Sequence, residues 1–374
     1  MTLSTSLLAA APLIVGLTGP AILGAVPGQH QVDRPAVEHA VEHAVEHAAA
    51  RQSMVVEHEA ARSDAEQRRV LGYWTPQRMA AALPIGLLDS VTDGDGLLSG
   101  LTGRGGVQTK PGVSGRSGVQ AKPGVSGGRT EINVGRRHQA SSRPQASTIG
   151  ARWSTGGAVT RTTGRVFLTL AGADFVCSAS TVTSASRDLV VTAGHCVKDG
   201  AGEWAQNWTF VPGYGRGGEQ PYGQYAARRM FVSAPWSRSG DDNHDVGMVA
   251  LATSGGRHVA DVVGTQDIAF NTRRGGQTYG FGYPADPPYD GDQLVYCAGR
   301  LRDDPYKQTR DQGLGCTMTA GSSGGPWLSG FDPMTGRGTV TSLSSFKYSD
   351  DQHTMYGPYF GQAAKAVYAT AERA

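Results

Sequence analysis

Short apolar and β-branched runs recur along the chain after about Ala146, and glycine- and proline-rich turn signals separate them. Helical periodicity is nearly absent from this region until Gly361 to Thr370. Such runs are typical of the strands of a β-sandwich or β-barrel. The pattern therefore predicts an all-β domain over residues 146–374 with one closing helix. The runs lie at Arg165 to Leu170, Leu189 to Thr192, Trp208 to Val211, Val246 to Leu251, Gln277 to Phe281 and Thr339 to Leu343.

Residues 1–26 contain an apolar segment, Leu7 to Val26, which gives way to polar sequence near Gln29. With a small residue at Ala25 for cleavage, this segment is typical of a signal peptide. Its prolines and glycines make a poor permanent membrane helix, although its length leaves a membrane-anchored form open. We therefore expect a secreted, extracellular protein.

Residues 27–100 are interpreted as a pro-region that is largely disordered or helical. It carries a helix-favouring Val-Glu-His-Ala repeat, with imidazoles at His39, His43 and His47 and an echo at Val56-Glu57-His58. Histidines at this spacing share one stripe and can hold a metal ion, but a solvated helix is the simpler interpretation. Further on, the aromatic pair Tyr73-Trp74 is either a docking face or a small local cluster.

Residues 101–145 form a Gly-rich basic linker. A ten-residue unit occurs in it twice, starting at Gly106 and Gly118, and such sequence buries too little apolar area to fold. Its arginines and lysines favour a processing segment, with binding to polyanions as the alternative. The whole chain has a net charge of only +2, which argues against nucleic acid as a partner.

Three separate stretches carry candidate acyl-transfer chemistry. Ser323 lies in Gly321-Ser322-Ser323-Gly324-Gly325-Pro326, where glycines leave room for a substrate backbone, although glycine–serine runs are also ordinary loop filler. A serine hydroxyl needs a base and a group that orients this base. His195 ends a β-branched run, and Asp245 leads directly into another, whereas Asp241, Asp242 and His244 are expected to be loop or surface residues.

These motifs resemble the trypsin- and chymotrypsin-like serine peptidases, especially their secreted bacterial members. Thr192-Ala193-Gly194-His195-Cys196 is similar to the histidine motif of that family, and the stretch around Ser323 is similar to its serine motif, with Ser322 where many members have Asp. The resemblance covers about Ala158 to Tyr368. It implies two packed antiparallel β-barrels, with His195 and Asp245 on the first and Ser323 on the second.

The resemblance also implies a serine endopeptidase. His195, Asp245 and Ser323 would form its catalytic triad, and the backbone N–H groups of Gly321 and Ser323 its oxyanion hole. Thr317 would lie at the base of the substrate pocket, where a neutral side chain favours small, apolar or aromatic residues. We expect a monomer that acts on proteins or peptides and needs no metal or cofactor. The alternatives are a catalytically idle binding module of the same fold and a secreted esterase.

All four cysteines fall within the predicted all-β domain. An even number in an exported chain implies disulfides, and three pairings are possible. Cys177 with Cys196 and Cys297 with Cys316 are the local pairs, and the first matches the family's bridge beside the catalytic histidine.

Overall fold

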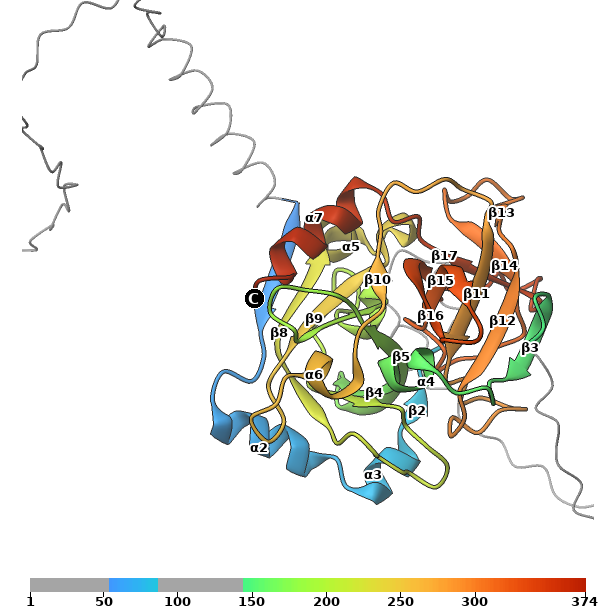
Figure 1. Cartoon of the computed structure of the whole chain (residues 1–374). Helices are drawn as coiled ribbons and strands as arrows, with labels where there is room; N and C mark the ends of the chain where they lie inside the picture. The colour runs from blue at the N-terminus through green and yellow to red at the C-terminus, as the bar shows by residue number, and fades with distance from the viewer. Residues whose placement is uncertain (1–53, 87–143) are drawn as a thin grey trace, which may run out of the picture. The chain divides into compact units, whose positions relative to one another are not determined.

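The computed structural model describes residues 54–86 and 144–374 (Figure 1). The apolar segment Leu7 to Val26, the repeat with His39, His43 and His47, and nearly all of the 101–145 linker lie outside the described residues. Within the described part of the chain, no helix is both long and apolar enough to cross a membrane.

Six antiparallel strands close into a first barrel. They follow the order β8, β7, β4, β5, β6, β9, and β9 pairs back with β8, which closes the barrel. The β-branched and aromatic side chains of these strands fill the barrel, and all eight residues of β4 are buried. The strands are β4 (Thr163–Leu170), β5 (Ala173–Thr181), β6 (Leu189–Thr192), β7 (Gln206–Pro212), β8 (Tyr225–Ser233) and β9 (Gly247–Leu251).

The second half of the domain is built from a six-stranded and a three-stranded sheet. Trp153 stands edge-on to Phe281, Tyr296 and Phe331 in its core, which is a favourable packing of aromatic rings. The six-stranded sheet has the order β10 (Asp267–Ile268), β16 (Arg337–Leu343), β15 (Pro326–Asp332), β11 (Gln277–Gly282), β12 (Val295–Arg300), β3 (Thr148–Arg152), and the smaller has β13 (Arg302–Asp303), β14 (Gln312–Gly315), β17 (Thr354–Gly357). The expected fold class is therefore confirmed.

Few helices cover these sheets. Helix α7 (Gln362–Ala371), expected over Gly361 to Thr370, buries Ala364, Val367 and Ala371 and packs against β8 and β9. This spacing puts the three side chains on one helix face. The other helices of residues 144–374 are short: α4 (Ala158–Thr162), α5 (Ala234–Ser239), α6 (Val259–Val263), and the 3₁₀ helices η1 (Gly194–Cys196) and η2 (Asp242–His244).

Residues 54–86 are folded onto the first barrel. They form β1 (Val55–Glu59), α2 (Asp64–Tyr73), α3 (Pro76–Ala81) and β2 (Leu83–Pro84), drawn in blue in Figure 1. The expected helix at Val56-Glu57-His58 is wrong, because β1 pairs antiparallel with β8 over its whole length. β8 offers an open edge, and Val55 and Val56 favour a strand. Together these two effects outweigh the helix preference of Glu57.

The aromatic pair Tyr73-Trp74 docks on the barrel. Trp74 is only 3% exposed, packs on Phe167 and donates from Nε1 to the Asn207 carbonyl (2.5 Å). Tyr73 donates its hydroxyl hydrogen to Asp174 Oδ1 (2.8 Å). Of the two interpretations of this pair, the structure supports the docking face.

The structure contains two disulfides, Cys177–Cys196 and Cys297–Cys316, each between cysteines 19 residues apart. The expectation of two disulfides is thereby confirmed. The first ties β5 to η1, and the second ties β12 to the end of β14.

Removing the second disulfide by the double substitution Cys297→Ala and Cys316→Ala should lower the free energy of unfolding by about 3 kcal/mol, because the unfolded chain regains loop entropy. Urea unfolding followed by tryptophan fluorescence would measure the change. A double variant as stable as the wild type would show that this bridge does not constrain the chain.

Candidate functional site

His195 lies in η1, immediately after β6, and is almost completely buried. The backbone fits closely here. A Cβ at position 194 would lie 2.9 Å from both Asp245 Oδ1 and Trp236 Nε1, so only glycine leaves room for the neighbouring carboxylate. The Cys177–Cys196 disulfide ties the residue that follows His195 to β5.

Asp245 holds His195 through two hydrogen bonds. Its Oδ1 accepts from the His195 backbone N–H (2.8 Å), and its Oδ2 lies 2.8 Å from His195 Nδ1. Ser345 donates a third hydrogen bond, from Oγ to Oδ2 (2.5 Å). Burial alone would raise the pKa of Asp245, but His195 and the Ser345 hydroxyl hold this pKa below its usual value. The carboxylate therefore stays charged and fixes the ring orientation.

Ser323 lies in the tight loop before β15 and is fully buried. Its carbonyl accepts from the Ser178 backbone N–H on β5 (2.7 Å), so the loop is attached to the first barrel. A Cβ at Gly324, where φ is +79°, would collide with the Thr192 hydroxyl and the Ser178 carbonyl. Neither Ser323 Oγ nor His195 Nε2 has a hydrogen-bond partner within the described residues. Such bonds often form only when substrate arrives.

The backbone beside Ser323 has free donors. Gly321 has a φ of +92°, a value that favours glycine, and its carbonyl is held by the Ser178 hydroxyl (2.9 Å). In the described part of the chain, the N–H groups of Gly321 and Ser323 donate to no acceptor. They are therefore available to a developing oxyanion.

Comparison with known proteins identifies the family. A family model described as Trypsin matches residues 154–364, more than half of the chain. The chain belongs to the trypsin family. The resemblance found in the motifs is thus confirmed, and the matched region of this trypsin-family chain is a serine endopeptidase domain.

Three known proteins show how far the similarity extends. The protease Anisep of Arthrobacter nicotinovorans is 38% identical, with a TM-score of 0.57, and the match covers 60% of this chain and 100% of Anisep. The extracellular metalloprotease of Bacillus subtilis is 40% identical over 72 residues, 19% of this chain and 23% of that protein. The glutamyl endopeptidase of Bacillus licheniformis is 34% identical over 100 residues, 26% of this chain and 30% of that protein. The chain thus spans less than a third of the two Bacillus relatives.

Thr317, expected at the pocket base of this trypsin-family domain, turns its hydroxyl toward β3. Thr317 Oγ1 donates to the Ile149 carbonyl (2.9 Å) and lies 3.2 Å from the Tyr289 hydroxyl. Lys347 lies next to this region and was not predicted from the sequence. Its side chain is 3% exposed, and its ammonium group donates to the carbonyls of Cys316 (2.9 Å) and Gln352 (2.6 Å). Burial lowers the pKa of Lys347 to about 8. A lysine so far from the serine motif carries no sequence signal.

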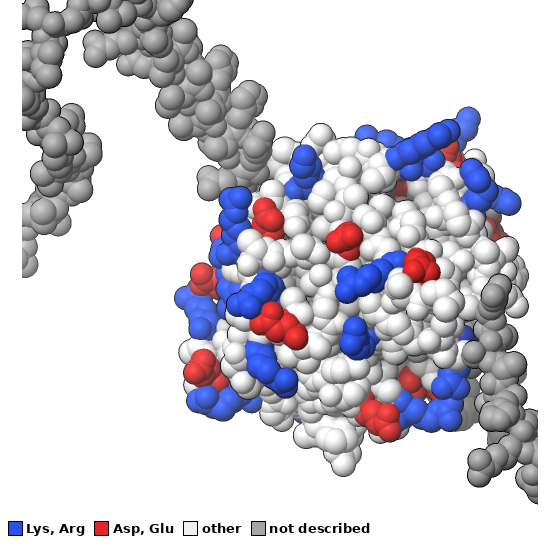
Figure 2. Space-filling model, in the orientation of Figure 1, with Lys and Arg blue, Asp and Glu red and all other residues white. Residues whose placement is uncertain are grey.

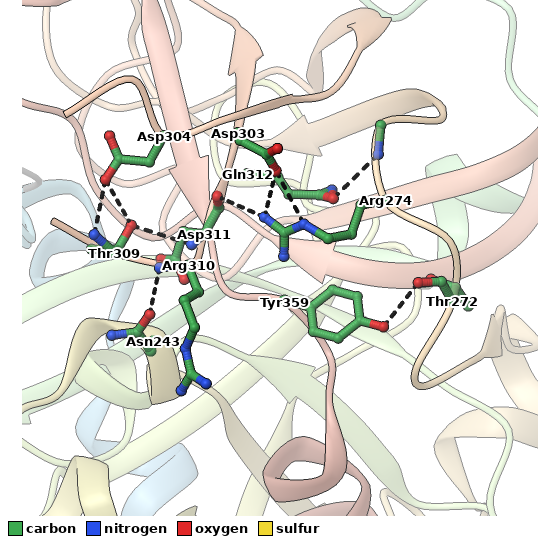
Figure 3. Close-up of polar contacts among 11 residues, drawn as sticks. Asn243, Thr272, Arg274, Asp303, Asp304, Thr309, Arg310, Asp311, Gln312 and Tyr359 are labelled. Atoms are coloured by element: carbon green, nitrogen blue, oxygen red, sulfur yellow. Dashed lines mark hydrogen bonds and ion pairs between the residues drawn. The ribbon is translucent and has the colours of Figure 1, made fainter. Parts of the chain in front are cut away.

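A second group of carboxyls lies close to Asp245. The Arg310 backbone N–H donates to Asn243 Oδ1 (2.6 Å), so the chain around Asp311 meets the loop that contains Asp242 (Figure 3). Both Asp311 oxygens and Asp242 Oδ1 are buried and have no partner within the described residues. Burial, with the charges of Asp245 and Asp241, raises the pKa of Asp242 to about 8. Asp242 is therefore not the simple loop charge expected.

The Asp242→Asn variant should gain stability over the wild type as pH rises. The folded state binds the Asp242 proton up to about pH 8, whereas the unfolded chain releases it near pH 4, so the wild type loses stability across this interval. Urea unfolding at pH 5 and pH 8.5 should show the larger advantage of the variant at pH 8.5. Asp267→Asn, at an exposed position on β10, is the control. An advantage independent of pH would contradict the argument.

Proposed function

We propose that this protein is a secreted serine endopeptidase that cleaves peptide bonds through an acyl-enzyme. The observation that carries the proposal is the buried pair of His195 and Asp245, held at 2.8 Å between Nδ1 and Oδ2, together with a buried Ser323 hydroxyl that has no partner within the described residues. This arrangement supplies the nucleophile, the base and the group that orients the base. The same chemistry is expected from the trypsin family.

In the proposed mechanism, Ser323 Oγ attacks the substrate carbonyl carbon while His195 Nε2 takes the hydroxyl proton. His195 then gives this proton to the leaving nitrogen, which departs as the amine. The oxyanion is stabilised by the N–H groups of Gly321 and Ser323, where one donor is typically worth about 3–4 kcal/mol. Water completes the cycle by hydrolysing the ester. Asp245 stabilises the imidazolium throughout.

We propose that the residue before the scissile bond is not basic. Thr317 offers no negative charge, and the Lys347 ammonium group beside Cys316 repels arginine and lysine side chains. Small, apolar, aromatic and acidic side chains remain compatible with these surroundings. Digestion of a peptide library would identify the preferred residue.

Export and processing are part of the proposal. We propose residues 1–26 as a signal peptide, 27–100 as a pro-region, 101–145 as a linker and 146–374 as the peptidase domain. Two disulfides fit an oxidising compartment. The Ser322 hydroxyl donates to the Thr319 carbonyl (2.7 Å), and no acid stands there to receive a newly formed N-terminus, so a zymogen of this chain would be activated by losing its pro-region.

We propose a monomer that acts on proteins or peptides. Figure 2 shows basic and acidic side chains interspersed on the face in view, without a field of one sign that would attract a nucleic acid. Proteins and peptides are therefore the proposed partners, and the mechanism as proposed uses no metal or cofactor.

Ser323→Ala should abolish hydrolysis and labelling by a fluorophosphonate, because the variant lacks the attacking oxygen. Ser322→Ala is the matched control: it removes the neighbouring hydroxyl, which donates only to Thr319, and should still be labelled. Casein digestion and intact mass after labelling measure the two effects. Equal casein cleavage by wild type and Ser323→Ala would reject the triad.

The same assays separate the alternative functions. A catalytically idle binding module would show neither labelling nor turnover in the wild-type protein. A secreted esterase would be labelled and would hydrolyse an ester substrate but leave the matching peptide amide intact. Cleavage of both amide and casein is the outcome that supports the endopeptidase.

Ser345→Ala should lower kcat while leaving the fold intact. A hydrogen bond to a charged group contributes about 1.5–3 kcal/mol, so a loss of roughly tenfold or more is expected if this bond orients Asp245 in the transition state. Steady-state kinetics on a peptide p-nitroanilide would measure it. A raised KM with unchanged kcat would assign Ser345 to substrate binding instead.

A further inference from the structure

Arg165 brings a buried charge to the contact between the two barrels. It lies on β4 directly opposite Ser178 of β5, and opposite residues of an antiparallel pair place their side chains on the same face of the sheet. On that face, the Ser178 hydroxyl binds the Gly321 carbonyl of the second barrel. The Arg165 side chain is only 6% exposed, and a charge is costly to bury unless it is paired. What Arg165 contacts therefore decides its role.

The partners of Arg165 on the second barrel belong to residues 283–292, which follow β11. Arg165 Nη1 lies 3.7 Å from Asp292 Oδ1, and Asp292 Oδ2 accepts from the Gly217 N–H (3.0 Å). Gly291, with a φ of +77°, packs directly on the guanidinium, because a Cβ at this position would lie 2.7 Å from Arg165 Nη2. The guanidinium thus supports the C-terminal end of this loop.

The first barrel fixes the guanidinium in turn. Its Cζ lies 5.2 Å from the ring centroid of Phe167 and 5.1 Å from that of Tyr214, and cations are attracted to aromatic faces. Burial lowers the pKa of Arg165, although Tyr214 and Asp292 favour its charged form. An arginine keeps its charge in proteins, so the pairing with Asp292 persists across the pH range of peptidase assays.

The other end of the same loop packs against the proposed oxyanion hole. The Gly291 N–H donates to the Pro284 carbonyl (2.8 Å), which joins the two ends of the loop. The Ala285 N–H donates to the Ala320 carbonyl (2.8 Å). A Cβ on Gly321 would lie 2.9 Å from the Ala285 Cβ, so no gap separates the loop from Gly321. A shift of the loop would therefore move the Gly321 N–H.

We propose that Arg165 is a positioning residue for the oxyanion hole, because it holds residues 283–292 against Gly321 and so fixes the direction of the Gly321 N–H. The inference rests on the proposed function. Arg165 acts through Gly291 and Ala285 and does not itself meet the substrate. Without the guanidinium, Gly291 loses the surface on which it packs. A displacement of about 1 Å at a catalytic group can cost about a hundredfold in rate.

Arg165→Met tests this role, because it keeps the length of the side chain and removes the charged plane. The kcat for a peptide p-nitroanilide should fall roughly tenfold to a hundredfold, while KM stays within about twofold, since the oxyanion forms only in the transition state. A peptide aldehyde should lose affinity by the same factor, because its adduct with Ser323 places an oxygen in the hole. Active-site titration with a fluorophosphonate corrects for unfolded enzyme.

Two further arginine variants separate positioning from stability. Arg165→Lys keeps the positive charge and should recover part of the lost kcat. Arg229→Met is the matched control: Arg229 also pairs with an acid, Glu57 (2.6 Å), and lies over an aromatic ring, Phe231 (5.3 Å), but it stands on β8. Its loss should leave both kcat and the aldehyde affinity unchanged.

Gly291→Ala tests the loop while Arg165 stays in place. The added Cβ would collide with the guanidinium, so kcat and the aldehyde affinity should fall together. Gly172→Ala is its control, because φ is similar (+80°) but no atom of the described residues lies within 4 Å of the added Cβ. Gly172→Ala should therefore lose stability without losing kcat.

Wild-type kcat and aldehyde affinity in the folded Arg165→Met and Gly291→Ala variants would overturn the inference and leave the peptidase assignment intact. A raised KM with unchanged kcat in these variants would overturn it too, by assigning the loop to substrate binding. If the wild type hydrolyses neither the p-nitroanilide nor casein, the proposed function fails, and the inference fails with it.

Discussion

The hydrogen bonds made by Ser178 are the constraint on which the rest of the site depends. Its backbone N–H donates to the Ser323 carbonyl, and its hydroxyl donates to the Gly321 carbonyl. The same hydroxyl accepts from the Tyr283 N–H (2.9 Å). Ser178, a fully buried residue of the first barrel, thus holds the loop of the second barrel at both Gly321 and Ser323. Since His195 is tied to the first barrel, Ser178 also sets the separation between the proposed base, His195, and the proposed nucleophile, Ser323.

The fold was largely predictable, because each strand carries its own signal. The β-branched run at Leu189 to Thr192 became β6 without a shift of either end, and Gly361 to Thr370 differs from α7 by one residue at each end. The helix prediction for Val56-Glu57-His58 was wrong for a physical reason. Its local sequence echoes a helix-favouring repeat, but its conformation is decided by the open edge of β8, far away in the sequence.

The candidate site was predictable only where a motif marks it. His195, Asp245 and Ser323 each stand in a recognisable local pattern, and the structure places His195 and Asp245 in direct contact. Ser178, Ser345 and Lys347 act through hydrogen bonds to residues distant in sequence, so a single chain gives no signal for them. Buried polar groups need partners, but which partners they find is decided by the packing of the two barrels.

Carboxyl burial has opposite consequences at neighbouring positions of the same loop. Asp245 accepts three hydrogen bonds and keeps its charge, whereas Asp242 has a buried oxygen without a partner among the described residues and retains its proton to about pH 8. If Asp242 were also charged near neutral pH, its field would raise the pKa of Asp245 and weaken its hold on His195. Because Asp242 stays neutral near neutral pH, the Asp245 carboxylate keeps the negative charge that the proposed mechanism requires.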